Sequence, residues 1–254
     1  MKSYLHRISN CQSIEELWEA HTQKMAEFGF DRLIYGFTRF LSEKKIFDPQ
    51  DAILLTNHDR EYTDVFVGEQ HYIDAPMFNW ALHNEGVGSW GMLAQMQADK
   101  TLTPAEQRMM EFNFSMGVTA GYTISFKSVS ARSKGAIALT AKKGMRQEEA
   151  DAIWDEHGHD IHLMNNVAHL KILSLPYTSP HRVLTKRQLE ALAWVGDGKT
   201  NQDIAVLMGL ASATVEKHLR LARQALAVET TAQAVLKTGL SNQMFILEGL
   251  RFRE

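Results

Sequence analysis

Four segments in the first two thirds of the chain have the apolar patterns of β-strands. Residues 121–129 and 134–141 alternate most clearly, and the polar residues 130–133 between them indicate a β-hairpin. Two shorter apolar or aromatic runs, residues 33–40 and 52–56, are bounded by polar or proline residues and predict two further strands. The pattern therefore predicts a sheet, and the hairpin makes at least part of it antiparallel.

Helices are indicated before, between and after these strands. Ser13 and Thr103 are each followed three residues later by a glutamate, the spacing of a capping box, which predicts helices over about 14–28 and 104–116. From Arg146 apolar side chains return every three or four residues, which predicts one long amphipathic helix ending near residue 173. The N-terminal part is expected to be an α+β domain with helices on the faces of its sheet.

A domain boundary is predicted directly after the long helix. Residues 174–180 contain two prolines, and each removes a backbone donor and disfavours helical geometry in the residue before it. A chain of 254 residues also favours two domains over one. We expect a domain over 1–173, a linker over 174–181 and a second domain over 182–254.

The second domain is predicted to be all-α with four helices. Thr185 starts the first helix, Thr200 the second and Thr230 the fourth, while the third begins near Ser212. Gly209 separates the second and third helices by a tight turn. Short helices arranged in this way form a helix-turn-helix, which places its second helix in the major groove of DNA.

Charge supports a nucleic-acid role for this part of the chain. Residues 182–254 carry 10 Lys and Arg against 7 Asp and Glu, whereas residues 1–181 carry 17 against 23. On the third helix, polar side chains lie away from the apolar stripe and are available to DNA: Glu216, Lys217, Arg220 and Arg223. A solvated helix face would show the same pattern, so charge alone leaves both interpretations open.

The second domain closely resembles the LuxR family of transcription factors. The matching residues are Leu184-Thr185, Leu192, Gly198-Lys199-Thr200, Ile204-Ala205, Leu207, Gly209, Thr214-Val215 and His218-Leu219. The resemblance implies a recognition helix from about Ser212 and a DNA interface that includes Lys199, Thr200, Thr214, Lys217 and Arg220. It also implies a homodimer, formed through the fourth helix, on a pseudo-palindromic site. Two residues differ from the family pattern: Gln188 replaces a usual Glu and Ala211 a frequent Ser, so we expect Ser212 to cap the recognition helix.

The first domain resembles the autoinducer-binding domain of quorum-sensing regulators. The residues that carry the resemblance are Tyr62, Phe66, Tyr72, Asp74, Pro76, Trp90, Gly117 and Gly121. The resemblance implies an α/β/α sandwich with a mainly antiparallel sheet, which encloses an acyl-homoserine lactone in an apolar pocket. The expected effector is therefore a small molecule, and no cofactor is expected.

The chemistry of such a lactone suggests roles for these side chains. Its amide N–H needs an acceptor when buried, and Asp74 is expected to supply it. Tyr62 is expected to donate to the lactone carbonyl, where the family uses an indole. Phe66 and Trp90 would form walls for the ring, and Gly121 would allow close approach of the backbone.

The acyl chain needs an adaptable apolar lining. Methionines fill irregular space, and the candidates are Met77, Met92, Met96, Met109, Met110 and Met116. Three residues depart from the family pattern: Ala75 interrupts its Asp-Pro pair, Tyr62 replaces the indole, and Ala138 stands where some members carry a hydroxyl. The ligand could therefore be a lactone, another small amphiphile, or absent.

Other functions are disfavoured by the sequence. There is no apolar run of about 18 residues and no signal-peptide pattern, so a cytoplasmic location is expected. Cys11 is the single cysteine and agrees with a reducing compartment. The cluster at 155–162 offers only a partial metal-ligand set on a helix, and no nucleophile or phosphate-loop motif is present. We expect no metal site and no enzyme.

Two hypotheses follow from the sequence. In the first, a ligand-responsive regulator binds an acyl-homoserine lactone or a similar signal and then a two-fold operator. In the second, the protein is a ligand-independent dimeric regulator whose first domain serves dimerisation. The target genes, activation or repression, and the direction of the ligand effect do not follow from the sequence.

Overall fold

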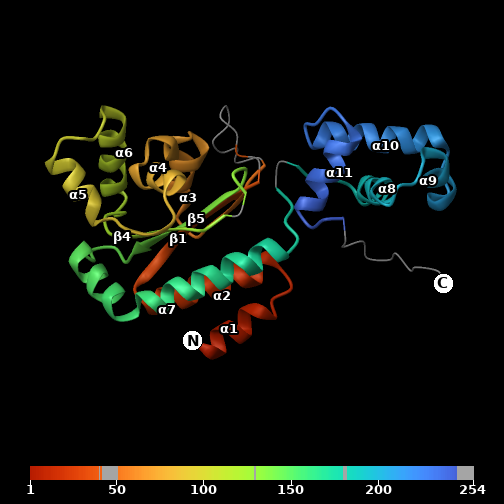
Figure 1. Ribbon diagram of the computed structural model, residues 1–254. Helices are drawn as coiled ribbons and strands as arrows, with labels where there is room; N and C mark the ends of the chain where they lie inside the picture. Colours follow the sequence, from red (N-terminus) through yellow and green to blue (C-terminus); the bar gives the residue numbers. More distant parts are fainter. Residues whose placement is uncertain (40, 42–50, 129, 180–181, 245–254) are drawn as a thin grey trace. The chain divides into compact units, whose positions relative to one another are not determined.

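The computed structural model describes residues 1–39, 41, 51–128, 130–179 and 182–244. It divides into two compact units, Met1–Leu173 and Ser174–Glu254 (Figure 1). The helices of the first unit are α1 (Lys2–Ser9), α2 (Ile14–Glu27), α3 (Arg60–Thr63), α4 (Pro76–His83), α5 (Gly91–Ala98), α6 (Pro104–Ser115) and α7 (Gln147–Ser174). Its strands are β1 (Phe30–Thr38), β2 (Ile53–Thr56), β3 (Gly86–Ser89), β4 (Gly121–Ser125) and β5 (Lys134–Ala141).

The sheet of the first unit is antiparallel throughout, with the strand order β2-β1-β5-β4-β3. β5 has the predicted bounds, whereas β1 begins three residues before the predicted start. The predicted ends of two strands, Phe40 and Val129, lie outside the described residues. β3 was not predicted, because Gly86 and Gly88 leave it with no alternating apolar pattern.

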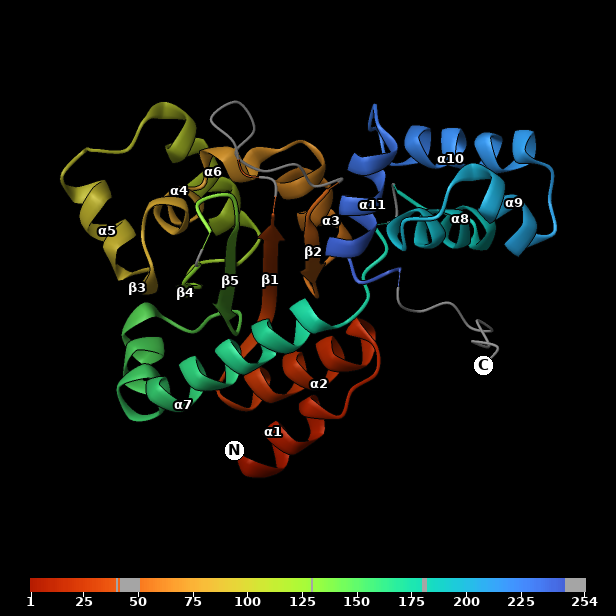
Figure 2. The same ribbon diagram turned by 45° about the vertical axis from the view of Figure 1, so that its right-hand side comes forward.

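The two faces of the sheet carry side chains of different size. On β5, Ile137 and Leu139 are fully buried on the face covered by α2 and α7 (Figure 2). Ala136, Ala138 and Thr140 alternate with them and face the short helices α3 to α6. Large side chains therefore fill one side of the sheet, and small side chains leave room on the other.

The layer of α2 and α7 contains two buried histidines. His21 on α2 bonds the Tyr4 hydroxyl through Nδ1 at 2.5 Å and Asn165 Oδ1 through Nε2 at 3.0 Å. His169 on α7 bonds the Tyr35 hydroxyl through Nδ1 at 2.8 Å. Burial lowers the pKa of each imidazole from 6.5 to about 4, because a charged ring would lose its hydration. Both side chains are neutral at physiological pH.

The second unit is a small helical domain with its own core. Its helices are α8 (Lys186–Gly196), α9 (Asn201–Met208), α10 (Ser212–Ala225) and α11 (Thr231–Leu240). Capping boxes are formed at Thr185, Thr200 and Thr230, and Gly209 ends α9 in the left-handed conformation with φ +64°. One prediction is wrong: the residue at the N-cap of α10 is Ala211, and Ser212 is already helical, so no side chain caps this helix.

The segment predicted as a linker is hydrogen-bonded within the second unit. The Tyr177 amide donates to the Ser241 carbonyl at 3.0 Å, and the Asn242 side chain donates to the Leu175 carbonyl at 3.2 Å. The apolar residues of the C-terminal tail, Phe245 to Leu247 and Phe252, lie outside the described residues.

Candidate ligand cavity and DNA-binding helix

The first unit contains a cavity of about 240 Å³ between the sheet and the helices α3 to α6. The sheet contributes Gly36, Ala136 and Ala138, which carry at most a methyl group. Larger side chains at these positions would fill the space, since they share one face of adjacent strands. The alternation of small and large residues along β1 and β5 thus creates the cavity.

An aromatic stack forms one wall of this cavity. The Tyr62 ring lies 4.6 Å from His58, 5.2 Å from Phe66 and 5.6 Å from Phe112, all near parallel. The Tyr62 hydroxyl donates to Asn113 Oδ1 at 2.9 Å, and burial raises the pKa of this phenol above its ordinary value. The donor predicted for a lactone carbonyl is therefore bonded within the protein.

Trp90 forms a second wall and is fixed by the sheet. Its indole Nε1–H donates to Thr123 Oγ1 at 2.9 Å, and its backbone amide donates to the Gly121 carbonyl at 3.0 Å. Gly121 does not line the cavity. A Cβ at this position would lie 2.2 Å from the Leu139 carbonyl oxygen, so this glycine admits the neighbouring strand and not a ligand.

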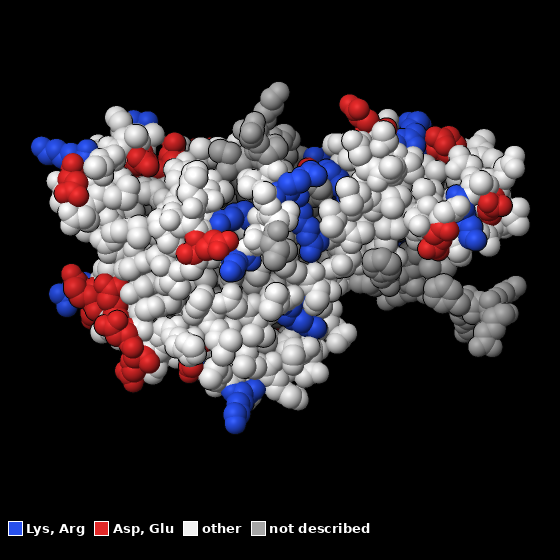
Figure 3. All heavy atoms as spheres, in the orientation of Figure 1, with Lys and Arg blue, Asp and Glu red and all other residues white. Residues whose placement is uncertain are grey.

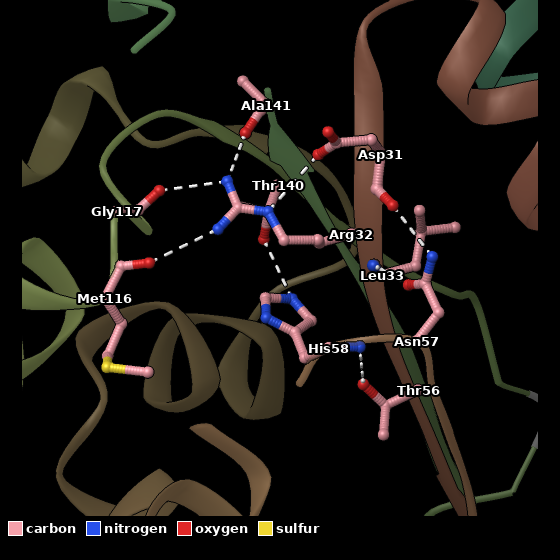
Figure 4. Close-up of polar contacts among 10 residues, drawn as sticks. All are labelled: Asp31, Arg32, Leu33, Thr56, Asn57, His58, Met116, Gly117, Thr140 and Ala141. Atoms are coloured by element: carbon pink, nitrogen blue, oxygen red, sulfur yellow. Dashed lines mark hydrogen bonds and ion pairs between the residues drawn. The ribbon is translucent and has the colours of Figure 1, made fainter. Parts of the chain in front are cut away.

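Polar groups gather where β1, β5 and the end of α6 meet (Figure 4). The Arg32 guanidinium donates to the carbonyls of Ala141 at 2.7 Å and Gly117 at 3.0 Å, which ties the residues after α6 to the sheet. Beside it, His58 Nε2 lies 3.3 Å from Thr140 Oγ1. Burial, with a smaller contribution from the positive charge of Arg32, lowers the pKa of His58 to about 3. His58 therefore presents a neutral imidazole to the cavity.

Six of the eight predicted ligand-binding residues line the cavity: Tyr62, Phe66, Tyr72, Met77, Trp90 and Ala138. Asp74 does not line it; it ends a 3-10 turn, and the next residue, Ala75, contributes to the wall in its place. Of the other predicted methionines, Met110 lines the cavity. Met92 and Met116 pack against the apolar cluster of Tyr62, Met77, Trp90 and Val118.

Sequence reasoning missed the polar lining residues His58, Asn113 and Thr123. Asn113 stands three residues after Met110 on α6, so helical spacing could have identified it. His58 and Thr123 carried no comparable signal, because one lies in a loop and the other in a strand of mostly buried residues.

In the second unit, α9, the turn at Gly209 and α10 form a helix-turn-helix. Lys217 and Arg220 are exposed on α10, and the described contact of Arg220 is with Gln224 of the same helix. Arg223 is engaged differently: it donates to the Thr231 hydroxyl at 2.8 Å and pairs with Glu216 at 3.1 Å. Arg223 therefore connects α10 to α11 and pairs with Glu216 on its own helix, whereas Lys217 and Arg220 remain accessible.

The remaining predicted contacts lie close to the recognition helix. Lys199 and Thr200 precede α9, and Ser212 and Thr214 lie in the first turn of α10. On the face drawn in Figure 3, blue and red side chains alternate over this unit, so it presents no large patch of one sign there.

The polar cluster at 155–162 does not form a metal site with other described residues. Within the described residues, no three His, Cys, Asp or Glu side chains lie close enough together to hold a metal ion. In the cluster at 155–162, His157 instead pairs with Glu156 at 3.6 Å and contacts the Phe28 ring. None of the helices formed by the described residues is long and apolar enough to span a membrane.

An apolar cavity in the first unit and a helix-turn-helix in the second are typical of DNA-binding transcription regulators that carry a small-molecule domain. Comparison with known families agrees: residues 13–172 match the autoinducer binding domain, and residues 182–238 match the bacterial regulatory proteins of the luxR family. The chain belongs to the LuxR-type quorum-sensing transcription regulators with an autoinducer-binding domain. Members of this family are transcription regulators and not enzymes.

Two distant relatives span most of the chain. The transcriptional activator AnoR of Acinetobacter nosocomialis is 23% identical over 225 residues, which cover 88% of this chain and 90% of AnoR. ExpR of Dickeya dadantii is 22% identical and covers 78% of each chain. Among solved structures, Escherichia coli SdiA matches with a TM-score of 0.55 at 15% identity, over 96% of this chain and 97% of SdiA. That match concerns the fold.

Proposed function

We propose that the first unit binds an acyl amphiphile in its cavity and that the protein then acts on DNA as a homodimer in the bacterial cytoplasm. The observation that carries this proposal is the cavity of about 240 Å³ with its mostly apolar and aromatic lining. Protein interiors are normally close-packed, so a space of this size lined in this way suits an apolar ligand. A ligand that fills the space would stabilise the folded domain.

An acyl-homoserine lactone is the first candidate ligand. The elongated row of small residues along β5 suits an acyl chain, and the aromatic walls at Tyr62 and Trp90 suit a small ring. Two structural neighbours support an acyl ligand: CepR2 of Burkholderia cenocepacia, described as N-acylhomoserine lactone dependent, and SdiA solved with octanoyl-rac-glycerol. Their TM-scores to this chain are 0.51 and 0.52.

Thermal unfolding of the full chain, measured with lactones of increasing acyl length, tests this proposal. A ligand that binds only the folded state at about 100 times its Kd adds about 2.7 kcal/mol and raises Tm. Ala138→Leu would fill the cavity and should remove the ligand-induced rise. Ala131→Leu, in the exposed hairpin turn, is the matched control. The proposal fails if no acyl ligand raises Tm, or if Ala138→Leu responds like the wild type.

A ligand-independent regulator is the second candidate. It is favoured by one observation: the Tyr62 hydroxyl and the Trp90 indole are already hydrogen-bonded to Asn113 and Thr123. Protein produced without any acyl signal distinguishes the two candidates. A ligand-independent regulator would bind its operator at full affinity, whereas a ligand-dependent one would gain affinity when the acyl ligand is added.

DNA binding is proposed to use Lys217 and Arg220, with contributions from Lys199, Thr200, Ser212 and Thr214. The salt dependence of binding to a duplex, followed by fluorescence anisotropy, tests it. Lys217→Ala should reduce the slope of log K against log salt by about one, since one fewer phosphate contact releases one fewer counterion. Arg187→Ala removes the same charge from α8, where Arg187 pairs with Glu190, and should leave the slope unchanged. Equal slopes in the wild type and Lys217→Ala would contradict the assignment.

A further inference from the structure

The described lining of the cavity contains no carboxylate. Its one charged side chain is Lys134, at the start of β5, which donates to the Asn84 carbonyl at 2.7 Å. Thr140 lies six residues further along the same strand, about 20 Å away at the rise of an extended chain. The polar side chains that line the Thr140 end of the cavity are therefore uncharged, and they can contact a ligand through neutral hydrogen bonds.

His58 holds the central place among these neutral groups. One face of its ring stacks on Tyr62 at 4.6 Å, and Nε2 lies 3.3 Å from Thr140 Oγ1. The backbone amide of His58 donates to Thr56 Oγ1, which anchors the loop (Figure 4). The second ring nitrogen, Nδ1, has no hydrogen-bond partner among the described residues. The residue lines the cavity, so a bound molecule can reach the ring.

The pairing with Thr140 allows Nδ1 of His58 to be either a hydrogen-bond donor or an acceptor toward a ligand. A neutral imidazole has one N–H donor and one acceptor nitrogen, and a threonine hydroxyl can act in either sense. If the Thr140 hydroxyl donates to Nε2, Nδ1 carries the proton and donates. If Nε2–H donates to Thr140, Nδ1 accepts. A carboxylate such as Asp74, in contrast, only accepts when it is ionised.

We propose that His58 selects the polar head of the ligand through a hydrogen bond at Nδ1. The site then binds uncharged acyl amphiphiles whose head offers either an amide N–H or a hydroxyl beside the acyl carbonyl. This inference rests on the proposed function, and it transfers to His58 the role that the sequence pattern assigns to Asp74.

Two substitutions separate hydrogen bonding at the two ring nitrogens. The side-chain amide of His58→Asn lies near the position of Nδ1, and that of His58→Gln reaches the position of Nε2. Calorimetric titration of the full-length protein with N-octanoyl-homoserine lactone and 1-octanoylglycerol measures Kd. His58→Gln should bind both ligands about tenfold more weakly, the cost of one buried hydrogen bond, and His58→Asn should stay within about threefold of wild type. A purely structural histidine would not produce this order.

Controls and the competing assignment complete the experiment. His71→Gln, at an exposed histidine that does not line the cavity, should bind like the wild type. Asp74→Asn is the competing arm: a larger loss there than in His58→Gln would overturn the inference, as would equal affinities of both His58 variants. If the wild type binds neither ligand, the proposed function itself fails and this inference with it. If the wild type binds and His58→Gln binds equally well, this inference alone fails.

Discussion

Replacing Arg32 tests how the end of α6 is held against the sheet. Arg32 is mostly buried, with 17% of its side chain exposed, and donates to the Ala141 carbonyl at 2.7 Å and the Gly117 carbonyl at 3.0 Å (Figure 4). Two longer contacts, with the Asp31 carboxylate at 3.3 Å and the Met116 carbonyl at 3.5 Å, contribute less. Arg32→Met keeps most of the aliphatic stem and removes all of the donors.

The expected loss follows from the two short hydrogen bonds. A bond from a charged donor contributes about 1.5 kcal/mol or more, so the first unit should lose about 3 kcal/mol of unfolding free energy. Urea unfolding followed by tryptophan fluorescence measures this loss, because four of the five tryptophans lie in the first unit. Arg146→Met is the control, since 74% of the Arg146 side chain is exposed.

The acyl ligand should also bind less tightly to Arg32→Met, because α6 carries Asn113 of the cavity wall. A change of unfolding free energy below about 0.5 kcal/mol, equal to that of the control, would refute this reasoning, since it would mean that water satisfies both carbonyls as well as Arg32 does.

Three further predictions follow from the described contacts. Stability should fall as pH drops from about 6.5 to about 4, because the unfolded state protonates His21 and His169 at higher pH than the folded state, whose pKa values are about 4; thermal melting should give a flatter pH profile for His169→Gln, and an unchanged profile would contradict this. Gly121→Ala should unfold the first unit at markedly lower urea concentration, because its Cβ would meet the Leu139 carbonyl oxygen at 2.2 Å; wild-type stability would show that the strands can separate at no cost. Gly209→Ala should lower the unfolding free energy of the second unit by about 1 kcal/mol, because alanine disfavours the left-handed φ of +64° and no neighbouring atom lies near the added Cβ. Calorimetry of the full chain can measure this, and an unchanged unfolding transition of the second unit would contradict it.

The helix-turn-helix could be predicted from sequence almost completely, because its determinants are local. Three helix starts, at Thr185, Thr200 and Thr230, and the turn at Gly209 depend on residues three or four apart, and all four lie where they were predicted. The exception, Ser212, is also local: the chain turns one residue earlier, so that Ala211 occupies the capping position without a side-chain acceptor. Local sequence did not predict which basic side chains of α10 remain accessible, because Arg223 donates a hydrogen bond to Thr231 on the next helix.

The residues of the cavity could be predicted from the sequence only in part. The aromatic residues Tyr62, Phe66 and Trp90 were identified through their joint resemblance to the family pattern, and all three line the cavity. The resemblance also indicated Asp74, but a shift of one residue in the turn before α4 brings Ala75 to the wall. A shift of one position in a tight turn changes the direction of the side chain, and its outcome depends on packing around the turn.

The sequence by itself determined four of the five strands and the helix-turn-helix, because apolar pattern and capping are properties of neighbouring residues. The tertiary structure alone decided which polar groups meet in the cavity. His58 and Thr140 are 82 residues apart and Tyr62 and Asn113 are 51 apart, so only the pairing of strands and the packing of α6 bring them within hydrogen-bond distance. The fold class is therefore a result of local pattern, and the chemistry of the ligand site is a result of long-range packing.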